Sequence, residues 1–175
     1  MDTDSLSIAR WQFRMAWRLA DDFHLDRLTD DVCLWQPHPN SWTVRETATG
    51  RWAADWAEPE PVDPPPPSVG WLTWHILWWW SDALDVLSGG RAGLRTDVSW
   101  PGMAQGVVAQ LRRLSDQWDA ATRDLDNEEA LHRPAAFPWR EERPLIYTIA
   151  WVPVELMKNV AEIGAVVNMH AHRRA

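Results

Sequence analysis

Apolar residues recur every three or four positions in four long segments of the chain, which is the spacing of one buried face of an α-helix. These segments run approximately over Ser5–Leu28, Val69–Leu87, Pro101–Leu125 and Pro144–His170. The third segment has the clearest pattern, with apolar residues at Val107, Val108, Leu111, Leu114, Trp118, Ala121 and Leu125. The pattern therefore predicts four amphipathic helices.

Proline and glycine mark the connections between these segments. Gly89 and Gly90 end the second segment, and Pro153 lies inside the fourth, where it is expected to kink the helix. The connection over residues 29–68 contains a run of four prolines, Pro64 to Pro67, which is typical of a stiff polyproline II spacer. Because this connection is far longer than ordinary bundle loops, we expect it to cap one end of the bundle.

The order of these elements favours an all-α fold. No alternation of strands with helices, no strand-like run and no repeat is visible in the sequence. The length of 175 residues fits one domain, so we expect a single helical domain over residues 1–175, with residues 171–175 as a disordered tail. Four amphipathic helices with proline-rich links are typical of an antiparallel-type four-helix bundle.

Charge and cysteine content narrow the classes of partner and compartment. The formal net charge is −8 and the pI is about 5.1, so the phosphate backbone of a nucleic acid should be repelled. Cys33 is the only cysteine and cannot form an intramolecular disulfide, which fits a reducing compartment. The N-terminus does not have the pattern of a secretory signal, and the most apolar stretch, Val69–Trp80, is too short to span a bilayer. We therefore expect a cytoplasmic protein that binds neither nucleic acid nor membranes.

The chain has 15 tryptophans but only 1 tyrosine and 3 phenylalanines. Two interpretations remain open. The tryptophans can fill the core where other proteins use leucine or phenylalanine, which helical spacing favours for several of them. They can also line a cavity for a small molecule, because an indole offers a large apolar surface and one N–H donor.

One group of polar residues is a candidate for chemistry. Glu155 and Asn159 are four residues apart and so project from one face of the fourth helix, and His75 lies on the second. An imidazole and a carboxylate are reasonable partial ligands for Zn, Ni, Mn or Fe. Glu162 lies further along the same face and Lys158 precedes Asn159, so both are candidate supporting residues. The simpler alternative is a hydrogen-bonded core histidine beside surface polar residues.

Three stretches of the sequence resemble one known family. They are LTDDVCLWQPHPNSW (residues 28–42), PPPPSVGWLTWHILWWW (residues 64–80) and WVPVELMKNVAEIG (residues 151–164). In order and spacing they resemble the connector, the second helix and the fourth helix of the DinB/YfiT-like metalloenzyme superfamily, across nearly the whole chain. The resemblance implies an up-down-down-up four-helix bundle with the long proline-rich connector between helices 1 and 2.

The resemblance also implies a divalent-metal site. His75 matches the first metal ligand of the family, and Glu155 matches the second, as in its mycothiol-dependent isomerase branch. The third ligand should be histidine, but this chain has Asn159, whose neutral amide is a poor ligand and should weaken metal binding. Trp71 and Trp78, which flank His75, are the expected pocket walls.

The function implied by the resemblance is a metal-dependent small-molecule enzyme. Relatives in this family use low-molecular-weight thiols such as mycothiol, so the expected reaction is a thiol-dependent S-transfer or isomerisation, with the catalytic residues unassigned. Two alternatives stay open. The protein can be a metal-free bundle that binds an apolar or aromatic small molecule, or a homodimeric interaction protein without catalysis.

Overall fold

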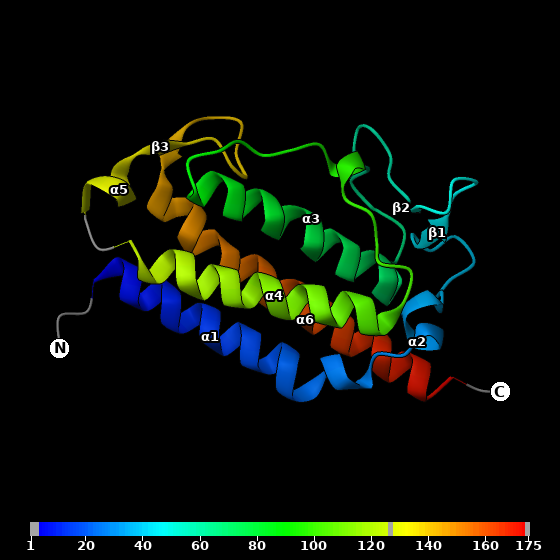
Figure 1. The fold of residues 1–175 in the computed structure, drawn as a ribbon. Helices are drawn as coiled ribbons and strands as arrows, with labels where there is room; N and C mark the ends of the chain where they lie inside the picture. The colour runs from blue at the N-terminus through cyan, green and yellow to red at the C-terminus, as the bar shows by residue number, and fades with distance from the viewer. Residues whose placement is uncertain (1–3, 126–127, 174–175) are drawn as a thin grey trace.

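The computed structural model describes residues 4–125 and 128–173, and in these ranges the chain is mostly helical. The four long helices are α1 (Ser5–Phe23), α3 (Val69–Leu87), α4 (Ala104–Arg123) and α6 (Leu145–Ala171). They lie side by side, with α1 and α6 running in one direction and α3 and α4 in the other (Figure 1). The packing joins α6 to both α1 and α3, and α3 to α4.

The bounds of these helices follow the hydrophobic pattern closely. The second predicted segment, Val69–Leu87, is a helix with those bounds. The largest difference is at α1, which ends at Phe23 rather than Leu28. The backbone of His24 leaves the helical conformation there, and Leu25–Arg27 form a separate 3₁₀ turn, η1.

Side-chain caps fix where the helices begin. The carboxylate of Asp4 accepts a hydrogen bond from the backbone N–H of Ser7 at 2.7 Å, at the start of α1. At the start of α3, the hydroxyl of Ser68 accepts one from the N–H of Trp71 at 3.2 Å and donates one to Thr43 at 2.9 Å. The second bond ties the start of α3, the helix that carries His75, to the connector.

The connector between α1 and α3 differs from the prediction, because it contains regular structure. It holds the short helix α2 (Asp30–Leu34) and two antiparallel strands, β1 (Val44–Glu46) and β2 (Trp52–Ala54). The turn between the strands includes Gly50, whose φ of 76° favours glycine. Each strand is only three residues long, so the alternation that would predict a strand is not visible in the sequence.

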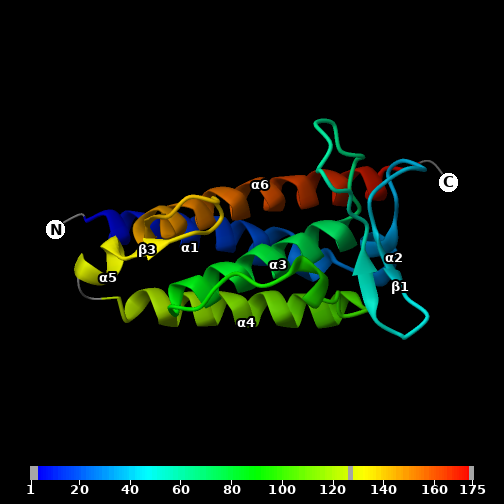
Figure 2. The same cartoon turned by 90° about the horizontal axis from the view of Figure 1, so that it is seen from above.

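Shorter elements lie on either side of α4. The 3₁₀ turn η2 (Arg95–Asp97) precedes it, and α5 (Glu128–His132) and the paired strands β3 (Pro134–Ala135) and β4 (Arg143–Pro144) follow it. The segment before α4 runs back along α3 to the β1–β2 hairpin (Figure 1). There the hydroxyl of Ser99 accepts a hydrogen bond from the N–H of Trp52 at 3.1 Å. The hairpin lies across the end of the long helices at which α6 finishes (Figure 2).

The C-terminal residues are more ordered than expected. Ala171 is the last residue of α6, His172 caps it, and Arg173 lies 3.1 Å from the carboxylate of Asp31. The rest of the expected tail, residues 174–175, lies outside the described residues. Within the described ranges, none of the helices has the length and apolar character that crossing a membrane would require.

The interior between α1, α3 and α4 is filled by large aromatic side chains. Phe13, Trp80 and Trp118 are each at most 1% exposed. The ring of Phe13 meets Trp80 edge-on at 5.5 Å and Trp118 at 5.9 Å between centroids. These tryptophans therefore fill core volume, as their helical spacing indicated.

Candidate functional site

His75 of α3 and Glu155 of α6 meet in the space between their helices. The Nε2 atom of His75 lies 3.5 Å from Oε1 of Glu155, and the side chains are 16% and 14% exposed. Leucines, valines and tryptophans on either side of both residues pack into the core, so these polar groups are held between apolar neighbours. The two residues singled out from the sequence on different helices are therefore in contact.

Lys158, one turn beyond Glu155 on α6, forms the closest ionic contact of this group. Its Nζ lies 2.6 Å from Oε1 of Glu155, the same oxygen that faces His75. Burial by itself raises the pKa of Glu155. The hydrogen bonds and positive charges of His75 and Lys158 outweigh that effect and hold the pKa below its ordinary value. Glu155 is therefore a carboxylate at neutral pH, with an ammonium group directly beside it.

Asn159 does not point its amide at this pair. It is 1% exposed, and its Oδ1 accepts a hydrogen bond from Nε1 of Trp79 at 3.0 Å. Its Nδ2 donates to Oε2 of Glu162 at 3.3 Å, so both ends of the amide have partners. Asn159 and Glu162 thus form a second polar contact, which satisfies the indole N–H of Trp79 inside the core.

These residues do not fit the three-ligand metal site implied by the family resemblance. The ammonium of Lys158 already contacts the oxygen of Glu155 that faces His75, and the oxygen of Asn159 already accepts a hydrogen bond. In the part of the chain that the structure describes, no group of three or more His, Cys, Asp or Glu side chains is placed to hold a metal ion. The donor set is one imidazole and one carboxylate already paired with a lysine.

Two indole rings of α3 pack against the imidazole of His75. Trp71 stacks on the imidazole at 5.0 Å and an interplanar angle of 10°, and Trp78 meets it edge-on at 5.6 Å. Trp56 of the connector stacks in turn on Trp71 at 6.2 Å and 8°. Trp71 and Trp78 therefore pack against the ring of His75, and that they line a ligand pocket stays a prediction. Trp56, which the sequence did not single out, completes a stacked column of three rings.

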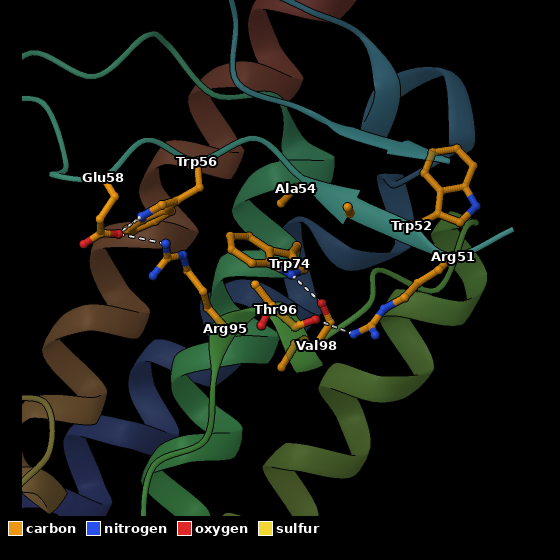
Figure 3. Close-up of a pocket in the computed structure, with 10 residues that line it drawn as sticks. Arg51, Trp52, Ala54, Trp56, Glu58, Trp74, Arg95, Thr96 and Val98 are labelled. Atoms are coloured by element: carbon orange, nitrogen blue, oxygen red, sulfur yellow. Dashed lines mark hydrogen bonds and ion pairs between the residues drawn. The ribbon is translucent and has the colours of Figure 1, made fainter. Parts of the chain in front are cut away.

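A pocket lies on the outer side of this column, between the β1–β2 hairpin, α3 and η2 (Figure 3). Its volume is about 330 Å³, and Trp56, Trp74, Arg51 and Arg95 are among the residues that line it. Nε1 of Trp74 donates to the backbone oxygen of Val98 at 3.0 Å, which fixes the orientation of that indole. The pocket thus shares an aromatic wall with the polar group around His75.

Sequence reasoning missed the charged residues of this pocket. Arg51 and Glu58 come from the hairpin and the loop that directly follows it, whereas Arg95 comes from η2, 37 residues after Glu58. No local spacing links them, because only the return of the segment before α4 to the hairpin brings them together. The one usable signal was the alternation of charged residues with tryptophans around Trp52 and Trp56.

The surroundings of Cys33 and His170 favour structural roles for both residues. Cys33 is fully buried, and burial, with a smaller contribution from Asp30, raises the pKa of its thiol to about 12, so it is not a thiolate at neutral pH. His170 is 8% exposed, and its Nε2 lies 2.8 Å from Asp31 of α2. It fastens the end of α6 to the connector.

Comparison with known proteins agrees with a helical fold of the DinB type. The family model described as the DinB superfamily matches residues 51–163, which include His75, Glu155 and both arginines of the pocket. Neither a curated protein nor a solved structure matches the chain. Because the family model covers more than half of its residues, the chain belongs to the DinB superfamily.

Proposed function

We propose that this protein binds a small aromatic or apolar molecule without a metal ion, on a bundle of the up-down-down-up DinB/YfiT-like type. The observation that carries the proposal is the 2.6 Å contact between Lys158 and Glu155. At that distance the lysine supplies the positive charge that a divalent ion would otherwise supply to the carboxylate. A cation placed between His75 and Glu155 would also be repelled by the ammonium group.

The binding site in this proposal is the pocket beside Trp56 and Trp74. Its volume of about 330 Å³ lies at the small end of the range of ligand pockets, which is roughly 300–1,000 Å³. Aromatic walls with a few polar groups are the usual composition of such sites. Trp56 stacks on Trp71, and Trp71 stacks on His75 of the His75–Glu155–Lys158 group. Trp56 therefore has a fixed partner behind it.

The experiment that tests this proposal combines metal analysis with ligand titration. Untagged protein from cells supplied with zinc, nickel, manganese and iron is expected to contain far less than one metal ion per chain by mass spectrometry. At least one of two planar probes, naphthalene-2-carboxylate or naphthalene-2-carboxamide, is expected to bind equally well with and without EDTA by calorimetry. A stoichiometric metal that is lost in His75→Ala, or a probe affinity that EDTA abolishes, would refute the proposal.

A second candidate is the metal-dependent, thiol-linked transferase or isomerase implied by the family resemblance. The observation that favours it is the convergence of His75 and Glu155, the first two ligand positions of the family, at 3.5 Å. Under this alternative, Asn159→His completes the ligand set and raises metal affinity. Unchanged metal uptake by this variant, with the helical content intact, would show that the ligand positions are misassigned.

Dimer formation is compatible with either function, and one face of the molecule favours it. Large apolar side chains are exposed along α1 and α6 at Ile8, Trp11, Met15, Leu19, Tyr147, Val154 and Met169. Exposed apolar patches of this kind commonly mark interaction surfaces. A molar mass that rises with concentration in analytical ultracentrifugation, and that Trp11→Glu keeps at the monomer value, would support a homodimer. We also propose that the protein is cytoplasmic.

A further inference from the structure

The two arginines of the pocket have different electrostatic surroundings. Arg95 lies 2.7 Å from the carboxylate of Glu58, and its guanidinium stands 4.8 Å above the ring of Trp56. Glu58 also accepts a hydrogen bond from Nε1 of Trp56 at 2.9 Å. The charge of Arg95 is therefore neutralised by Glu58, and its position is fixed by two contacts.

Arg51 has no such compensation. Its Nη2 donates to the backbone oxygen of Thr96 at 2.6 Å, a neutral acceptor that fixes the side chain without cancelling its charge. Among the described residues, no carboxylate forms an ion pair with Arg51. In a chain of net charge −8, this makes the pocket a local site of positive charge.

Figure 3 shows Arg51 and Arg95 on opposite sides of Trp74, with the ring of Trp56 near Arg95. Trp74 is only 3% exposed, so a ligand in the pocket meets a small part of its indole and can reach toward Arg51 with one end. The guanidinium offers parallel N–H donors in a plane, a geometry that matches a carboxylate. One uncompensated arginine also fits one negative charge better than the two of a phosphate monoester.

We propose that this pocket recognises a small aromatic carboxylic acid, with its ring against Trp56 and Trp74 and its carboxylate on Arg51. This inference rests on the proposed function, because it names the ligand class of the same pocket. The volume of about 330 Å³ restricts the ligand to a molecule with one or two rings and excludes a peptide or a nucleotide chain as the main occupant.

The test compares naphthalene-2-carboxylate with naphthalene-2-carboxamide, which differ in charge but hardly in shape. Calorimetry at neutral pH on the full chain should give a wild-type affinity about tenfold higher for the carboxylate, because a charged hydrogen bond is roughly twice as strong as a neutral one. Arg51→Met should remove this preference and leave carboxamide binding nearly unchanged. Arg14→Met, an equal loss of charge on an exposed position of α1, should keep it.

The other possible results separate the proposal of a metal-free aromatic site from the assignment of a carboxylate to Arg51. Equal affinity for both probes in the wild type, or an unchanged preference in Arg51→Met, overturns the carboxylate assignment and leaves the proposal of a metal-free aromatic site standing. Binding of neither probe by protein with intact helical circular dichroism overturns both. Trp56→Leu should weaken both probes, and unaltered binding by this variant would place them outside the pocket and overturn the inference.

Discussion

Tryptophan occupies two different environments in this protein. Between α1, α3 and α4, Trp80 and Trp118 are almost fully buried, and within the described residues Nε1 of Trp80 has no hydrogen-bond partner. Near the connector, the indole N–H groups of Trp56, Trp71 and Trp74 each donate to an oxygen atom. The first group fills volume, whereas the second is oriented by hydrogen bonds.

This difference separates a core from a binding wall. A core tryptophan contributes through its apolar area, which tolerates an unpaired N–H when the packing gain is large enough. A tryptophan of the pocket wall is held in place by its N–H and by the rings it contacts, and only part of its ring needs to reach the pocket surface. Residue count therefore says little about function here, and the exposure and contacts of each indole are more informative.

The largest effect that would test this comparison is loss of a core indole. Trp118→Ala should lower the free energy of unfolding by about 3–5 kcal/mol, because the side chain is 1% exposed and would leave a large cavity. Urea denaturation at neutral pH measures it. The matched control is Trp11→Ala on α1, where the side chain is 56% exposed and the loss should stay below about 1 kcal/mol. Equal losses for both variants would contradict the division.

A smaller effect is expected from the buried amide that serves the core. Asn159→Leu leaves the N–H of Trp79 without its acceptor, which should cost about 1–3 kcal/mol of unfolding free energy. Asn168→Leu, on the exposed side of the same helix, is the control and should change stability by less than about 0.5 kcal/mol. If Asn159→Leu were as stable as the wild type, the Trp79 contact would have no energetic role.

The stability that the His75–Glu155–Lys158 group contributes to the fold should depend on pH. Because the pKa of Glu155 is lower in the folded protein than its ordinary value of 4.5, its contacts stabilise the fold fully above that pH. This contribution is lost as the pH falls through the folded-state pKa, below 4.5. Glu155→Gln should therefore cost about 1 kcal/mol at neutral pH and less at an acidic pH below 4.5. Urea denaturation at both pH values measures it, and a stability difference independent of pH would contradict an ionised Glu155.

The smallest effect on unfolding free energy is expected at the pocket, from Glu58. Glu58→Gln should change unfolding free energy by less than about 0.5 kcal/mol, since the carboxylate is 69% exposed. It should nevertheless raise affinity for naphthalene-2-carboxylate about threefold, because it removes the negative charge that neutralises Arg95. Calorimetry measures this change. Glu60→Gln, exposed in the same loop, should leave affinity unaltered, and an identical gain in both variants would indicate a general charge effect.

Much of the helical architecture could be predicted from the sequence. The heptad-like spacing of Val107, Leu111, Leu114 and Trp118 depends only on local geometry, and those four residues do form the buried or nearly buried face of α4. The β1–β2 hairpin could not be predicted, because its strands are too short for alternation to appear. Their pairing depends on where the segment before α4 returns.

The candidate site could also be predicted only in part from the sequence. The contact between His75 and Glu155 was predicted from one helical face and the family resemblance, and the structure brings the two side chains to 3.5 Å. The role of Lys158 was left open, since a lysine three residues from a glutamate can face solvent or the carboxylate with equal ease along a helix. In the structure its Nζ lies 2.6 Å from Oε1 of Glu155, although the lysine side chain is 54% exposed.

The sequence by itself determined the four helices and the DinB-like order of motifs, because both depend on spacing along the chain, whereas the contact of His75 with Glu155 also required α3 to pack against α6. Only the tertiary structure decided which polar groups are already satisfied and where a charge is left without a partner. Arg51 meets the pocket through a hairpin turn and Asn159 turns toward Trp79, and both orientations follow from contacts between segments far apart in the chain.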